Sequence, residues 1–315
     1  MFPTPIVGGL AMFMAVGIAL LLEAQVTKDI QVLWGCSAAL VSLGVLDDKH
    51  GLSVRLRMLL QVFLVAVVIT GADGTITHLG SLFGNDILLG MFAIPFSVVA
   101  FVGGINAINM IDGADGMAGK MALITMLGVM VMCSIAGASH LLPLTYALTG
   151  ALIGFLIFNT RIFVRRAWVF MGDAGSMWLG LILGWFMAQI THDQVGAEPA
   201  LVLWLFGIPL IDTLVVMTRR VRQKVSPFAA DRTHIHHVLE HAGFSVARTV
   251  LLLSLAQTVL VGIGVIFYMM KAPAALVFWS FVMLITGYYY LLRDCKLKSG
   301  STPISSEEPS DTPLI

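Results

Sequence analysis

The chain has 315 residues, of which 58% are hydrophobic and only 11% are charged, and its mean hydropathy is +0.93. Soluble domains are about half apolar and about a quarter charged, so this composition excludes an ordinary soluble protein and indicates one that spans a membrane. The 18 basic and 18 acidic residues cancel, so net charge offers no case for nucleic-acid binding.

Ten stretches are apolar enough to cross a bilayer, for which about 17–25 residues suffice. In chain order they are 6–22, 30–46, 57–71, 87–103, 118–137, 141–158, 174–191, 199–217, 249–270 and 272–292. We therefore predict an all-α, polytopic membrane helical bundle in which residues 1–292 form a single domain. Residues 293–315 are polar and rich in Ser and Pro, and are predicted to be a disordered cytoplasmic tail.

The basic residues predict the orientation of the bundle, because Lys and Arg favour cytoplasmic loops. With the N-terminus inside, only Lys28 and Lys271 of the 18 basic residues lie outside, which leaves 16 on the inner side. The predicted cytoplasmic segments besides the tail are 47–56, 104–117, 159–173 and 218–248.

Paired acids follow the second predicted span in "GVLDDKHG". Asp47 and Asp48 would stand at a helix C-terminus, where negative charge opposes the helix dipole, so a cation or a basic partner is expected nearby. The alternative is a solvated turn. Asp173 in "VFMGDAGS" directly precedes the seventh predicted span, on the same predicted face of the membrane.

The segment "NAINMIDGADGMAG", residues 106–119, is the most polar part of an otherwise apolar region. Asn106, Asn109, Asp112 and Asp115 are spaced by three, so in a helix they would share one face. Packing contacts between helices are the alternative, but they seldom need two ionised acids, which are costly near hydrocarbon. Oxygen ligands of this kind suit Mg²⁺ or Mn²⁺, and Mg²⁺ commonly shares its shell with substrate phosphates.

Histidines gather in "SPFAADRTHIHHVLEHAG". Zinc is one interpretation of His234, His236 and His237, but the loop has no Cys and lacks the metalloprotease spacing. With Arg232 beside them, an anion-binding loop that donates to phosphate oxygens fits better.

A cation-coupled transporter is the alternative from another functional class. Asp212, inside the eighth predicted span, is the acid that fits it best. Transporter sites lie near the membrane midplane between repeats, whereas the other acids flank loops on one side and no internal repeat is evident.

Five segments, "GVLDDKHGLSVRLRMLLQ", "NAINMIDGADGMAG", "VFMGDAGS", "GIPLIDT" and "SPFAADRTHIHHVLEHAGF", occur in the order found in the polyprenyl-phosphate N-acetylhexosamine-1-phosphate transferase family, which the chain resembles. The resemblance implies transfer of GlcNAc-1-phosphate from UDP-GlcNAc to undecaprenyl phosphate, with release of UMP. It implies a multi-pass protein of the bacterial inner membrane, in contact with membrane lipid, that acts in O-antigen or related polysaccharide synthesis. Another UDP-N-acetylhexosamine remains open, as does a homodimer.

The resemblance also assigns roles to residues. It implies that Asn109 and Asp173 hold Mg²⁺, with Mn²⁺ as a substitute. The implied catalytic acids are Asp47, Asp48, Asp112 and Asp115. The implied substrate-binding residues are Asn106, Arg232, His234, His236 and His237.

Two features depart from the patterns of related enzymes. The family usually has one more span before "PTPIVGGLAMF", so either that helix is lacking or the start lies further upstream. The sister transferase for phospho-MurNAc-pentapeptide carries three consecutive histidines where this chain has "HIHH", which favours a small amino sugar here.

Overall fold

The computed structural model describes residues 4–23, 26–160, 167–192, 194–224 and 234–298, with side chains described as far as residue 290. Within these residues the regular elements are helices, and the only strand-like pairing is an isolated bridge between His78 and Leu88. Residues 293–298 of the predicted tail continue the last helix, and the rest of the tail lies outside the described residues. The all-α prediction is confirmed for the part of the chain that is described.

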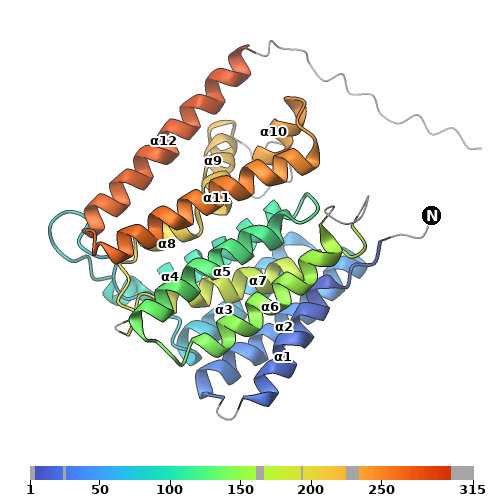
Figure 1. Ribbon diagram of the computed structural model, residues 1–315, viewed down its shortest axis with the longest axis vertical. Coiled ribbons are helices and arrows are strands. Elements are labelled where there is room, and N and C mark those ends of the chain that lie inside the picture. Colours follow the sequence, from blue (N-terminus) through green and yellow to red (C-terminus); the bar gives the residue numbers. More distant parts are fainter. Residues whose placement is uncertain (1–3, 24–25, 161–166, 193, 225–233, 299–315) are drawn as a thin grey trace, which may run out of the picture.

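Every predicted span corresponds to a helix (Figure 1). The elements are α1 (Gly8–Leu22), α2 (Lys28–His50), α3 (Val54–Gly71), η1 (Gly90–Phe92), α4 (Ala93–Ile111), α5 (Met117–Ala136), α6 (Leu142–Asn159), α7 (Gly172–Gln189), α8 (Leu201–Leu205), α9 (Gly207–Arg222), α10 (Ile235–His241), α11 (Val246–Met269) and α12 (Ala274–Lys298). Six of these, namely α2, α3, η1 with α4, α5, α6 and α11, are long and apolar enough to cross a membrane. Several spanning helices in one chain make this a multi-pass membrane protein.

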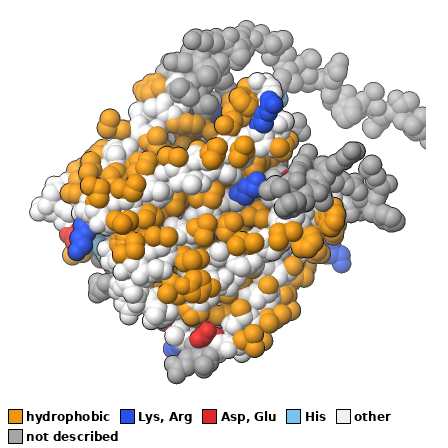
Figure 2. All heavy atoms as spheres, in the orientation of Figure 1, with side chains coloured by type: hydrophobic (Ala, Val, Ile, Leu, Met, Phe, Trp, Pro, Cys, Tyr) orange, Lys and Arg blue, Asp and Glu red, His pale blue; other side chains and the backbone are white. Residues whose placement is uncertain are grey.

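The outer surface of the bundle is apolar. Figure 2 shows hydrophobic side chains spread over the visible face, with few Lys and Arg side chains among them. Large side chains such as Phe63, Val99 and Leu255 are 64%, 72% and 55% exposed. Continuous apolar surface of this extent is unusual for a soluble monomer and suits a lipid environment.

Helix α7 is the centre of the bundle and packs against α1, α2, α4 and α5. Its residues Ala174 to Leu183 are all buried. Small residues bring the helices together: a Cβ on Gly44 would lie 2.3 Å from the Cα of Ala174, and one on Gly180 would lie 2.4 Å from the Cα of Ile105. Close backbone approach through small residues is typical of membrane helices, and here it holds α2, α4 and α7 in fixed register.

The eighth predicted span is interrupted between α8 and α9. Pro209 has no amide hydrogen and its ring excludes a regular helical contact with the carbonyl of Leu205, four residues earlier. That carbonyl instead accepts hydrogen bonds from Thr125 Oγ1 and Gln257 Nε2, each at 2.8 Å, and Gln257 Oε1 accepts from the Ile208 amide at 2.8 Å. The break therefore leaves its polar backbone groups satisfied inside the bundle.

Candidate active site

A cavity of about 340 Å³ opens at one end of the bundle, where α2 and α4 end and α5 and α7 begin. We call it the carboxylate cavity. It is lined by Ile6, Asp48, Asn109, Asp112, Gly113, Ala114, Asp115, Asn159, Phe170, Met171, Gly172 and Asp173. Segments from four distant parts of the sequence thus contribute polar side chains to one space.

Asp48 caps the first turn of α7. Its Oδ1 accepts a hydrogen bond from the Asp173 amide at 3.0 Å, and its Oδ2 accepts one from the Ala174 amide at 3.4 Å. A carboxylate stabilises a helix N-terminus because it satisfies free amides and complements the helix dipole. Gly172, with φ +73°, makes the approach sterically possible, since a Cβ there would lie 2.6 Å from Asp48 Oδ2.

Asn109 connects α4 to α7 inside the cavity. Its Nδ2 donates to Asp173 Oδ1 at 2.6 Å and to Ser176 Oγ at 2.9 Å. This orientation leaves the amide oxygen of Asn109 without a hydrogen-bond partner in the described part of the chain. Asn109 and Asp173, which the resemblance pairs, are therefore adjacent.

Asp112 and Asp115 reach the cavity from a turn and not from a helix. Helix α4 ends at Ile111, so the predicted continuous stripe from Asn106 to Asp115 is wrong beyond that point. The turn ends at Gly116, whose φ of +79° favours glycine. Asn109, Asp112 and Asp115 nevertheless line the same cavity.

Four aspartate side chains crowd the cavity. Burial raises the pKa of Asp112 well above its ordinary value, and the charges of Asp173, Asp48 and Asp115 raise it further. Carboxylates that oppose one another's ionisation in this way are stabilised by a cation placed between them.

The donor set fits a hard divalent cation such as Mg²⁺. Among the described residues no three His, Cys, Asp or Glu side chains form a ready-made cage. Mg²⁺ does not require one, because it usually takes one or two carboxylates and completes its octahedral shell with waters and substrate phosphates. Asp173 and the unpartnered amide oxygen of Asn109 supply oxygen ligands of that kind.

Asp47 lies behind the cavity and does not line it. Only 3% of its side chain is exposed. Oδ2 pairs with Arg57 Nη1 at 2.6 Å, and Oδ1 accepts from the Leu52 amide at 2.7 Å. The same Arg57 Nη1 is 3.6 Å from Asp173 Oδ2. Asp47 thus closes the turn between α2 and α3 and holds the Arg57 guanidinium beside Asp173, so Arg57 is the basic partner expected near this pair of acids.

Asn106 lies one turn deeper than Asn109, outside the cavity lining. Its Nδ2 donates to the Val102 carbonyl at 2.7 Å and to Gln61 Oε1 at 3.0 Å. These bonds join α4 to α3, so in this structure the side chain serves helix packing.

The histidine loop is anchored by Asp212. Its Oδ2 is 2.7 Å from His234 Nδ1, and its Oδ1 accepts from the Ile235 amide at 2.8 Å. Both side chains are buried. These two contacts account for the buried position of Asp212. An ion pathway, as in the transporter alternative, is not needed to explain it. Arg232 lies outside the described residues.

His236 lies beside the carboxylate cavity. A Cβ on Gly113 would lie 2.7 Å from its Nε2, so its ring packs directly on the Asp112 turn. Burial lowers the pKa of His236 to about 4, and the charge of His237 adds to this effect. Neither ring nitrogen has a hydrogen-bond partner among the described residues, although the side chain is 98% buried, leaving 2% exposed. His237 is turned to Glu240, at 3.8 Å.

Asn159 is a site residue that sequence reasoning missed. Its Oδ1 accepts from the Gly116 amide at 2.7 Å, and its Nδ2 donates to the Val169 carbonyl at 2.7 Å. It therefore joins the Asp112 turn to the segment that precedes Asp173. The feature in the sequence that could have indicated it is a single amide side chain at the end of the sixth apolar stretch.

Comparison with known proteins gives a family-level match. The model of the family described as glycosyl transferase family 4 matches residues 30–191. The undecaprenyl-phosphate alpha-N-acetylglucosaminyl 1-phosphate transferase of Yersinia pestis is 34% identical over 264 residues, which are 83% of this chain and 72% of that protein. The protein of the same name from Escherichia coli strain K12 is 31% identical over the same shares. The decaprenyl-phosphate N-acetylglucosaminephosphotransferase of Mycolicibacterium smegmatis is 33% identical over 285 residues, 80% of this chain and 69% of that protein.

Proposed function

The chain belongs to glycosyl transferase family 4, and from this premise we propose that it transfers GlcNAc-1-phosphate from UDP-GlcNAc to undecaprenyl phosphate. The observation that carries the proposal is the carboxylate cavity, in which Asp48, Asn109, Asp112, Asp115 and Asp173 meet at one end of the spanning helices. A site at a membrane surface suits an acceptor whose phosphate is polar and whose tail stays in the bilayer.

In the proposed reaction an oxygen of the acceptor phosphate attacks the β-phosphorus of UDP-GlcNAc. The bond from that phosphorus to the bridging oxygen breaks, and UMP leaves with the electron pair. The acceptor monoester has a second pKa of about 6, so it is largely ionised at neutral pH and does not require a strong base. Positioning and charge neutralisation therefore provide most of the catalysis.

Asn109 and Asp173 would hold the divalent cation, either Mg²⁺ or Mn²⁺. When bound, the cation neutralises diphosphate oxygens as a Lewis acid. Asp48 fixes the first turn of α7, and it would either orient the acceptor phosphate or take its last proton. Asp112 and Asp115 line the same cavity. His236 and Arg232 would donate to the sugar nucleotide.

We place this site on the cytoplasmic side of a bacterial inner membrane, in a bundle of ten spans, at the first membrane step of O-antigen or related polysaccharide synthesis. The support for the orientation is the distribution of Lys and Arg, of which 16 of 18 are assigned to the side that carries the acids. The ten helical segments that match the predicted spans support the count, with α8 and α9 together forming one of them.

The test is a transfer assay with purified protein, undecaprenyl phosphate and radiolabelled sugar nucleotide. We expect label from UDP-GlcNAc to enter the lipid, with equimolar UMP, and EDTA to abolish the reaction until Mg²⁺ or Mn²⁺ is restored. UDP-GalNAc is the control for the sugar. Equal transfer from UDP-GalNAc would contradict the assigned donor, and full turnover in metal-free buffer would contradict the cation.

A further inference from the structure

A second cavity, of about 560 Å³, lies at the other end of α5, and we call it the distal cavity. Helix α5 has 20 residues, starts at Met117 beside the carboxylate cavity and ends at Ala136, which lines the distal cavity. At about 1.5 Å per residue this is about 30 Å, the thickness of the hydrocarbon core of a bilayer. The distal cavity therefore lies at the headgroup level of the opposite leaflet.

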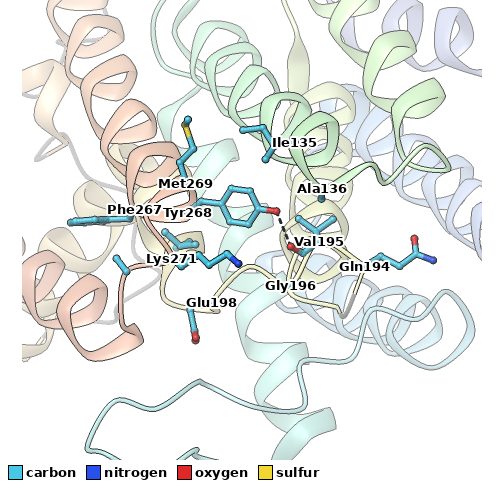
Figure 3. Close-up of a pocket in the computed structure, with 12 residues that line it drawn as sticks. Ile135, Ala136, Gln194, Val195, Gly196, Glu198, Phe267, Tyr268, Met269 and Lys271 are labelled. Atoms are coloured by element: carbon cyan, nitrogen blue, oxygen red, sulfur yellow. Dashed lines mark hydrogen bonds between the residues drawn. The ribbon is translucent and has the colours of Figure 1, made fainter.

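Two helix ends and one loop enclose the distal cavity. Tyr268 at the end of α11 donates a hydrogen bond to the Val195 carbonyl at 2.8 Å, which ties this helix to the loop between α7 and α8 (Figure 3). The volume of the distal cavity lies within the range found for small-ligand sites, about 300–1,000 Å³. The connection between α11 and α12 completes the wall with Lys271.

The backbone at Lys271 is one that glycine normally adopts. Helix α11 ends with the Lys271 amide bonded to the Tyr268 carbonyl at 3.0 Å and the Ala272 amide bonded to the Phe267 carbonyl at 2.9 Å. This pair of bonds defines a Schellman motif, whose left-handed position is usually glycine. Lys271 occupies it with φ +50°. Because the backbone disfavours lysine there, its presence points to a use for the side chain.

The ammonium of Lys271 shares the distal cavity with the Glu198 side chain but is not paired with it. It forms no ion pair with a carboxylate in the described structure. Glu198 is nearby but turned away from the Lys271 ammonium in Figure 3, and its Oε2 would lie 2.6 Å from a Cβ on Gly80. The free ammonium thus suits an anion.

Apolar side chains continue from the cavity onto the lipid-facing surface. Ile135 and Met269 line it and are 53% and 64% exposed. We propose that the distal cavity binds a phospholipid, with the headgroup phosphate on Lys271 and the acyl chains over Ile135 and Met269. This ligand combines the two features of the site, an unpaired cation at headgroup level and an adjoining apolar surface.

The test is native mass spectrometry of the delipidated protein titrated with phosphatidylglycerol, whose only headgroup charge is its phosphate. Lys271→Gln should weaken the tightest lipid-binding event about five-fold, the factor expected for one lysine charge at a lipid surface. Lys271→Arg should retain binding. Lys28→Gln is the matched control, because Lys28 is the other basic residue predicted on this side.

Lys271→Gly separates binding from folding. Glycine relieves the left-handed backbone, so this variant should be at least as thermostable as the wild type and still bind lipid about five-fold more weakly. Unchanged lipid affinity in the Gln and Gly variants, or an equal loss in Lys28→Gln, would overturn the proposal. Displacement of the lipid by soluble glycerol phosphate at matched concentration would also overturn it, in favour of a site for soluble anions. These readouts do not depend on sugar transfer.

Discussion

The side-chain amide of Asn109 donates a hydrogen bond to the Asp173 carboxylate at 2.6 Å and so joins the last turn of α4 to the first turn of α7. The two residues are 64 positions apart in the chain. Their contact orients one carboxylate oxygen and leaves the Asn109 carbonyl oxygen without a partner in the described structure.

Replacing Asp173 with Asn should lower kcat by about a hundredfold or more while the protein still folds, because the change keeps the shape and removes the charge. The matched control is Ser176→Ala. Ser176 also contacts Asn109, at 2.9 Å, but does not line the cavity. Steady-state kinetics with both substrates measures the difference. A near-normal rate in Asp173→Asn would remove this residue from the proposed cation site.

Asp47 and Asp48 should differ although they are adjacent. Asp47→Asn removes the shorter of the two ion pairs of the partly buried Arg57, so we expect a loss of about 2 kcal/mol in unfolding free energy. Asp48→Asn should leave stability closer to the wild type, because its Oδ1 can still cap α7, and should lower kcat more than Asp47→Asn does. Thermal unfolding in detergent and kcat for both variants test this. Equal defects in both quantities would show that the pair acts as one unit.

Asn159 should matter for both stability and activity. Asn159→Ala removes the acceptor of the Gly116 amide and the donor to the Val169 carbonyl, and a buried polar group left unpaired costs about 1–3 kcal/mol. Asn159→Asp keeps an acceptor for Gly116 and should be intermediate. Unfolding temperature and the KM for UDP-GlcNAc report on the two effects. Wild-type behaviour of the alanine variant would show that the Asp112 turn is held by other contacts.

His236 should make the protein less stable in acid. Its pKa is about 4 when folded and about 6.5 when unfolded, so between these values the unfolded state binds more protons and stability rises with pH. Between pH 7 and pH 5 the protonation of this one group should lower the free energy of unfolding by about 2 kcal/mol.

His236→Gln removes that contribution, so the variant should lose less stability than the wild type over the same interval. His241→Gln, at the exposed end of α10, is the control. Parallel pH profiles for the wild type and His236→Gln would contradict the assigned pKa.

The orientation of the bundle can be tested by labelling. In a background without Cys36, Cys133 and Cys295, Arg165→Cys and Arg232→Cys should react with a membrane-impermeant maleimide only when the cytoplasmic face is open. Labelling of either position in intact cells with a sealed inner membrane would reverse the topology and move the proposed site to the other face.

The sequence by itself determined the helices and the segments that carry chemistry. Apolar length is a local property, and in a membrane each backbone segment must satisfy its own hydrogen bonds, so the predicted spans correspond to helices, the eighth of them to two. Motif order likewise pointed to Asp48, Asn109, Asp112, Asp115 and Asp173, which all line one cavity. Even the interruption between α8 and α9 follows from a local cause, the missing amide hydrogen of Pro209.

Only the tertiary structure decided what the remaining polar residues do. Asp47 and Asp48 are adjacent and chemically identical, yet one pairs with Arg57 behind the cavity and the other caps α7 inside it. Asp212 and His234 are 22 residues apart, and this spacing does not predict their contact. A buried polar group must find a partner, and which partner it finds depends on how distant helices pack.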